Sequence, residues 1–131
     1  MIELHFAEEA LRVVQAFLQL GMQTQFICRT SLSRIYYAAH HLGRLLLTTI
    51  GLTPSRWRRD VHRRVIDELE RRFVTQGTMS ANAWQTLSQL RTYRIQADYE
   101  LTLHVREQDV RDAVIRLTEY LNECRRILGV T

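Results

Sequence analysis

Apolar residues recur every three or four positions along almost the whole chain, and this spacing restricts the fold more than any other feature. Such a period is typical of helices with one buried face. The clearest pattern covers about 107–128, and similar spacing predicts helices at about 3–20, 24–50, 55–75 and 80–99. There is one proline, and strand-like alternation is confined to the short run 101–105. The sequence therefore predicts an all-α, up-and-down bundle of four main helices plus a short or additional helix.

The length and composition fit a single domain. Of its 131 residues, 46% are hydrophobic and 24% charged, so residues 1–131 can bury one core but not two. No run is long and apolar enough to span a bilayer, and Met1 leads into an amphipathic segment rather than a signal peptide. Cys28 and Cys124 stand far apart without metal-ligand spacing. We therefore expect a cytoplasmic protein with reduced, buried thiols, no membrane association, no metal site and no cofactor.

All 18 basic side chains are arginine, and the formal net charge is +4. Arginine makes bidentate contacts with phosphate, so this composition would suit a protein that binds nucleic acid. Genome-wide base composition can also replace lysine by arginine without any functional consequence, and both explanations stay open. The densest run, 56–72, contains seven arginines and four acidic residues. It fits either a solvated, self-paired surface or an RNA-contacting rim on which Trp57 could stack against a base.

The segment 33–41 places polar side chains where a plain bundle would have apolar ones. Arg34, Tyr37 and His41 share one side of the predicted second helix, at the edge of its apolar stripe. An arginine and a histidine so close to a packing face need either partners or a function. These three residues are therefore candidates for a functional site.

The segment 91–99 has the same character at the end of the predicted fourth helix. Arg94 lies in line with buried positions, Arg91 precedes it by one turn and Asp98 follows it by one turn. One interpretation is an internal polar network in which Asp98 pairs with Arg94 or Arg34 and a tyrosine hydroxyl completes the set. The other is a cleft in which arginines hold a phosphate while His or Tyr transfers protons. Spacing alone does not separate the two.

Together these segments resemble the HEPN-domain family, most closely its small stand-alone bacterial and archaeal branch. The likeness spans about residues 20–128 and rests on three features in order: Ser33-Arg34-x-Tyr36-Tyr37-Ala38-Ala39-x-His41, a basic segment with His62, and Arg91-x-x-Arg94-x-x-Ala97-Asp98-Tyr99. The resemblance implies a small α-bundle that usually dimerises, with motif residues of both chains lining a shared cleft. Many members are metal-independent ribonucleases, and several are toxins encoded beside a minimal nucleotidyltransferase antitoxin. Others are inactive RNA- or nucleotide-binding modules.

The chain departs from the family pattern at one position that matters for catalysis. Active HEPN ribonucleases carry a histidine about four to six residues after the motif arginine. Here Arg94 is followed by Ile-Gln-Ala-Asp-Tyr-Glu-Leu, and the next histidine is His104. The motif arginine therefore maps to Arg94, and the motif histidine maps to no residue. His41 or His62 could supply proton transfer in its place.

We expect Arg94 and His41 to be the catalytic residues. The residues expected to bind RNA or a nucleotide are Arg34, Tyr37, Arg91, Asp98, Tyr99 and His62. The expected partners are RNA or a nucleotide, a second copy of the chain and, by resemblance, a nucleotidyltransferase antitoxin. The alternative is a non-catalytic module that binds nucleotides, RNA or another protein, and the missing histidine favours it.

Overall fold

The structure is a computed structural model that describes residues 1–130. In that range it contains α1 (Ile2–Gln19), α2 (Gln25–Thr49), α3 (Val61–Leu69), α4 (Ala81–Tyr99) and α5 (Glu107–Leu128). A 3₁₀ turn, η1 (Pro54–Arg56), precedes α3, and a π-helical turn, η2 (Glu70–Val74), extends it. Within residues 1–130 there is no strand, and no helix is both long enough and apolar enough to cross a membrane.

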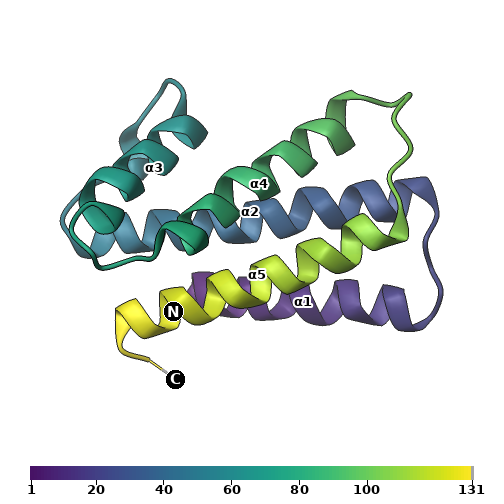
Figure 1. Cartoon of the computed structure of the whole chain (residues 1–131), viewed down its shortest axis with the longest axis horizontal. Helices are drawn as coiled ribbons and strands as arrows, with labels where there is room; N and C mark the ends of the chain where they lie inside the picture. The colour runs from purple at the N-terminus through teal and green to yellow at the C-terminus, as the bar shows by residue number, and fades with distance from the viewer. Residues whose placement is uncertain (131) are drawn as a thin grey trace.

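Four of the helices form an up-and-down bundle, and α3 packs at one end of it (Figure 1). The chain runs along α1 and back along α2, passes through α3, and then runs along α4 and back along α5 (Figure 1). The central helix is α2, which contacts α1, α3, α4 and α5. The predicted all-α bundle of four main helices plus a short one is therefore confirmed.

Side-chain caps and a glycine set several helix ends. At the start of α2, Thr24 Oγ1 accepts a hydrogen bond from the backbone N–H of Ile27 at 3.3 Å. Ser80 Oγ accepts from the N–H of Ala83 at 3.1 Å at the start of α4. Gly129 ends α5 with φ of 73°, a left-handed conformation that glycine adopts without strain. These local signals explain why the bounds of the four long helices lie close to the predicted ones.

The core of the bundle is apolar. All five α-helices contribute side chains to it, and Tyr36 and Tyr120 are the largest residues that are fully buried. Cys28 and Cys124 are both buried and free, which confirms the predicted thiols. Burial raises the pKa of Cys124 to about 12, so this thiol stays protonated.

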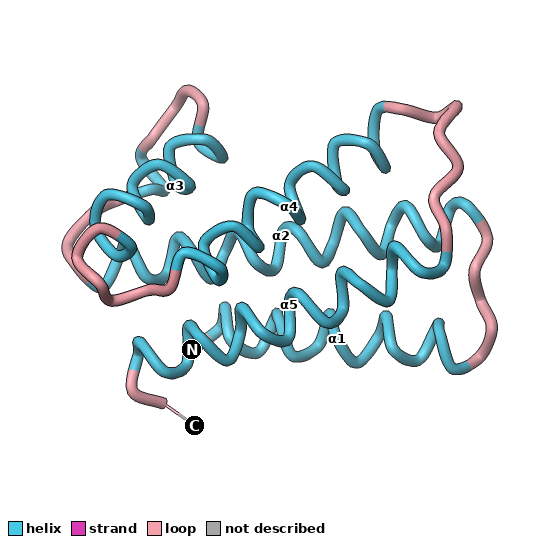
Figure 2. The backbone as a smooth tube through the Cα atoms, viewed as in Figure 1, coloured by secondary structure: helices cyan, strands magenta, loops and turns pink. Residues whose placement is uncertain are grey.

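The predicted third helix, 55–75, is wrong in its first part. The helix begins only at Val61, after η1 and a loop that contains Trp57 (Figure 2). Trp57 has an extended backbone and packs its side chain against the core. Asp60 has φ of 50°, a left-handed conformation that a helix interior does not contain. The break matters because it places His62 in the first turn of α3.

Helix α3 approaches α2 closely because residue 43 is glycine. A Cβ at Gly43 would lie 3.0 Å from Leu69 Cδ1 and 3.1 Å from Val65 Cγ1. A larger residue would have to push these side chains away. This close contact helps to hold α3, and with it His62, against the side of α2 that carries Tyr36.

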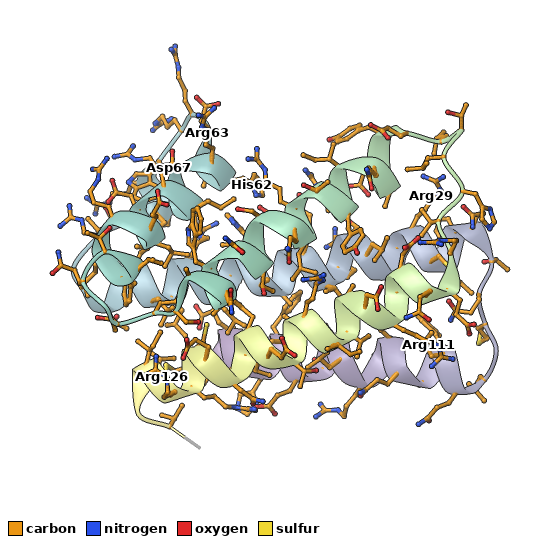
Figure 3. The ribbon with its side chains drawn as sticks, viewed as in Figure 1. Arg29, His62, Arg63, Asp67, Arg111 and Arg126 are labelled. Carbon is orange, nitrogen blue, oxygen red and sulfur yellow. The ribbon has the colours of Figure 1, made fainter. Side chains whose placement is uncertain are left out.

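The connection between α4 and α5 is fastened to α2. The Arg29 guanidinium donates to backbone oxygens at the end of α4 and in the loop that follows, including those of Ala97 (2.9 Å) and Leu103. Figure 3 shows Arg29 beside this loop. The last carbonyl groups of a helix have no partner within the helix, so an arginine that reaches them acts as a cap. It ties to α2 the last turns of α4, which carry Arg94 and Asp98.

Candidate functional site

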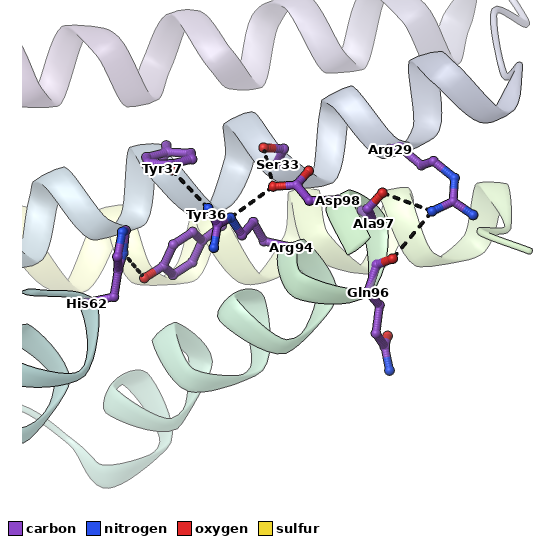
Figure 4. A network of polar contacts seen from close by, with 9 residues as sticks. All are labelled: Arg29, Ser33, Tyr36, Tyr37, His62, Arg94, Gln96, Ala97 and Asp98. Atoms are coloured by element: carbon purple, nitrogen blue, oxygen red, sulfur yellow. Dashed lines mark hydrogen bonds and ion pairs between the residues drawn. The ribbon is translucent and has the colours of Figure 1, made fainter. Parts of the chain in front are cut away.

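Arg94 joins α4 to α2 through polar contacts. Its Nη2 donates to Tyr37 Oη at 3.0 Å, and its Nε lies 3.0 Å from Asp98 Oδ2 in an ion pair (Figure 4). Ser33 Oγ donates to the same carboxylate oxygen at 3.4 Å. The network of Arg94, Asp98 and a tyrosine hydroxyl, one of the two interpretations of the sequence, is therefore present. Nη2 of Arg94 is hydrogen-bonded in these contacts, whereas Nε, although ion-paired with Asp98, is buried without a hydrogen-bond partner within residues 1–130.

Two arginines from different helices meet at the ring of Tyr37. The Cζ atom of Arg34 lies 4.7 Å from the ring centroid, and that of Arg94 lies 5.3 Å from it. Both distances are within the range of cation–π attraction. The exposed ring of Tyr99, at the end of α4, lies 5.7 Å from Cζ of Arg94. Of the predicted binding residues, Tyr37 and Tyr99 therefore lie beside Arg94, and Arg34 lies over the same Tyr37 ring.

His62 reaches the same place from the first turn of α3. Its Nδ1 lies 2.7 Å from Tyr36 Oη, and its ring centroid lies 5.8 Å from that of Tyr37 (Figure 4). Figure 3 shows His62 on the side of α3 that faces α4, whereas Arg63 points outward. A tyrosine hydroxyl can accept from Nδ1–H or donate to a bare Nδ1, so Tyr36 supports either neutral tautomer of His62.

His40 is a member of this site that sequence reasoning missed. Its ring stacks on that of His62, with centroids 4.3 Å apart and planes inclined by 34°. The residue is only 3% exposed, and its Nδ1 has no hydrogen-bond partner within residues 1–130. A signal was available, because His40 follows Tyr36 by four positions and so shares its helical face. We call Tyr36, Tyr37, His40, His62 and Arg94 the arginine–histidine cluster.

The two histidines of the cluster are neutral at pH 7. Burial, reinforced by the neighbouring His62, lowers the pKa of His40 to about 3. Burial, followed by the charges of Arg94 and Arg91, also lowers the pKa of His62. Burial raises the pKa of Tyr36 to about 12, so its hydroxyl keeps its proton. The positive charge of the cluster therefore comes from arginine, and His62 is free to accept a proton.

His41 does not lie on the side of α2 that faces His62. Its ring centroid is 6.0 Å from that of Phe6 in α1 and 5.6 Å from that of His40. Burial lowers its pKa as well. Within residues 1–130, none of its ring contacts involves Arg94. The structure thus does not bring the two predicted catalytic residues together, and catalysis by His41 stays a prediction.

Arg91 offers donors that the protein does not use. Its Nε is buried and has no hydrogen-bond partner within residues 1–130. It lines a groove of about 320 Å³ between α3 and α4, together with Arg63, Ile66, Asp67, Ser88, Thr92 and Ile95. Arg91 lies one helical turn before Arg94 on α4, and its charge contributes to the lowered pKa of His62. A phosphate entering this groove would meet Arg91, whereas Arg94 is not among the groove's lining residues.

The arginine-rich segment 56–72 is partly self-paired. Glu68 forms ion pairs with two arginines one turn further along, each at 3.2 Å. The Cζ atom of Arg64 lies 4.2 Å from the centroid of the Trp57 ring, so arginine covers one face of that ring. This contact limits the use of Trp57 as a stacking platform, while Arg58 and Arg59 stay exposed beside it.

Among residues 1–130, no three His, Cys, Asp or Glu side chains are placed to hold a metal ion together. No model of a known protein family matches the chain, and no curated protein matches it significantly. The geometry of the arginine–histidine cluster and the likeness of the motifs are therefore the basis on which a function can be proposed.

Proposed function

We propose that the protein is a HEPN-like RNA-binding protein and that Arg91 and the arginine–histidine cluster hold a phosphate of the RNA backbone. The observation that carries this proposal is that Arg94 of α4 and His62 of α3 converge on the same two tyrosines of α2, Tyr36 and Tyr37. Arg91 lies one helical turn before Arg94. Guanidinium groups bind phosphate oxygens through paired N–H donors. Metal-independent cleavage of RNA requires a general base for the 2′-hydroxyl, and a neutral imidazole next to the phosphate can serve as that base.

In the catalytic form of the proposal, His62 takes the place of the missing motif histidine. When its Nδ1–H donates to Tyr36 Oη, the Nε2 lone pair is free to accept the proton of a ribose 2′-hydroxyl. The 2′-oxygen then forms a bond to phosphorus, the bond from phosphorus to the 5′-oxygen breaks, and that oxygen takes a proton from water. Arg91 and Arg94 stabilise the negative charge that the phosphate oxygens gain.

A non-catalytic module that binds RNA or a nucleotide is the second candidate, and one observation favours it. Arg94 already uses two nitrogens on Asp98 and Tyr37, an arrangement that stabilises the α2–α4 contact whether or not a ligand is present. Arg91 would then bind phosphate without any proton transfer. From the HEPN likeness we also propose a homodimer, a nucleotidyltransferase antitoxin as a partner, and a location in the cytoplasm.

Incubation of the purified protein with structured and single-stranded RNA in EDTA tests both candidates. Wild type is compared with Arg91→Gln, His62→Gln and a matched control, His5→Gln, at an exposed position of α1. A ribonuclease would cleave in EDTA, and His62→Gln would slow cleavage by about 100-fold, which is typical for loss of a general base. A binding module would leave the RNA intact, and Arg91→Gln would weaken binding by about tenfold.

Arg91 is the better arginine to replace, because Arg94 also holds α2 and α4 together and its loss could unfold the protein. Circular dichroism of each variant shows whether the fold is kept. Wild type that neither binds nor cleaves RNA would contradict the proposal. RNA binding that Arg91→Gln and His5→Gln reduce equally would contradict the assigned site.

A further inference from the structure

Helix α1 carries a second apolar stripe on the face that points away from the bundle. Its buried stripe consists of Leu4, Ala7, Leu11, Val14 and Leu18. The outer stripe, at intervals of four and three, consists of Ile2, Phe6, Glu9, Val13, Ala16 and Leu20. Its large apolar members are exposed: Ile2 by 81%, Leu20 by 73%, Val13 by 47% and Phe6 by 39%. The outer face of a surface helix is usually polar, so this stripe indicates a binding surface.

An apolar groove continues the outer stripe towards α2. It has a volume of about 360 Å³ and runs between Phe6, Val13 and Phe17 of α1 and Thr30 and Arg34 of α2. Its walls are almost entirely apolar. Helix α1 packs against α2 and α5 at an edge of the bundle (Figure 1), so the stripe and the groove form one continuous outer surface.

We propose that this surface binds the same surface of a second copy of the chain, with the two α1 helices antiparallel. Apolar intervals of four and three are the pattern of helices that pair along a seam. In a two-fold arrangement whose axis passes between Glu9 and Val13, Phe6 faces the small Ala16 of the second copy. In the same arrangement, Ile2 at one end of the stripe faces Leu20 at the other end of the stripe in the second copy. The surface is thus complementary to itself in size, as a symmetric dimer requires.

The charges on this face also fit a second copy. Glu9 lies in the middle of the stripe and Arg12 lies beside it, and neither forms an ion pair within residues 1–130. Near the two-fold axis, two glutamates and two arginines come together and balance each other. A lipid surface would instead have to take up the Glu9 carboxylate without a partner, which is unfavourable.

The homodimer is part of the proposed function, and this inference assigns it a surface. Arg34 borders the groove and also lies over Tyr37, so the second copy would sit next to the arginine–histidine cluster. Self-association through α1 needs no RNA. A failure of dimerisation can therefore be distinguished from a failure of RNA binding.

Sedimentation equilibrium of the full chain over a hundredfold range of concentration tests the proposal, since mass action makes a dimer dissociate on dilution. We expect Val13→Glu to weaken the dimer by at least tenfold, because it places a charge in the seam. Leu101→Glu, at an exposed apolar residue of the α4–α5 loop, is the matched control and should leave dimerisation unchanged. Both positions are exposed, so both variants should fold, which circular dichroism checks.

Charge reversal tests the antiparallel arrangement itself. Glu9→Arg or Arg12→Glu alone should weaken the dimer, since each leaves four like charges near the axis. The double variant Glu9→Arg/Arg12→Glu should restore it to within about threefold of wild type. A monomer at every concentration, or a dimer that Val13→Glu does not weaken, would overturn the proposal. A double variant as weak as the single ones would overturn the assigned pairing.

Discussion

The buried His40 should make the stability of the protein depend on pH. Its pKa is about 3 in the folded protein, whereas a histidine of the unfolded chain titrates near 6.5. Below pH 6.5 the unfolded chain therefore takes up a proton at this residue that the folded protein does not. The free energy of unfolding therefore decreases as the pH is lowered. The loss is about 1.4 kcal/mol per pH unit in this window, or about 2 kcal/mol between pH 7.5 and pH 5.

Urea unfolding of wild type and His40→Gln at these two pH values measures the effect. The uncharged glutamine removes the titration, so the variant should lose about 2 kcal/mol less than wild type between pH 7.5 and pH 5. His41 and His62, whose pKa values are also lowered, contribute in the same direction in both proteins. The control His5→Gln should follow wild type. An equal loss in wild type and His40→Gln would refute the reasoning from burial.

Three further substitutions test the packing around the cluster. Tyr37→Phe removes the acceptor of Arg94 Nη2 and should lower the free energy of unfolding by about 1–2 kcal/mol in urea titrations; an unchanged value would contradict the hydrogen bond. Gly43→Val brings atoms into the space that Leu69 occupies and should cost about 1–3 kcal/mol or more, seen as a lower Tm. Arg29→Ala releases the carbonyl groups of the α4–α5 loop and should speed amide exchange at residues 100–106. Exchange at the centre of α5 should not change, and uniform acceleration would count against a local role.

Most of the fold could be predicted because periodicity and helix ends are local properties of the sequence. Thr24 and Ser80 have the residue type and the position of helix caps, and they lie where α2 and α4 begin. The start of α3 could not be predicted in this way. Trp57 leaves the helical path to pack against the core, and such a tertiary contact overrides the local pattern of the segment.

The site was predictable in part. Asp98 lies one helical turn after Arg94, so their ion pair follows from spacing, but spacing did not show that Tyr37 would be the third member. His62 belongs to another helix, and its contact with Tyr36 depends on how α3 docks. Periodicity carries no information about that docking. His40 was different, because its position one turn after Tyr36 could have identified it.

Nuclear magnetic resonance of the histidine rings, with an RNA protected from cleavage by 2′-O-methyl groups, tests the phosphate site most directly. A phosphate bound between Arg91 and Arg94 favours the charged form of His62, so RNA should shift the His62 ring signals and raise the pKa of that residue. His5 should not respond, and Arg91→Gln should weaken the response of His62. Saturating RNA that leaves the signals and the pKa of His62 unchanged would contradict a phosphate site at the arginine–histidine cluster.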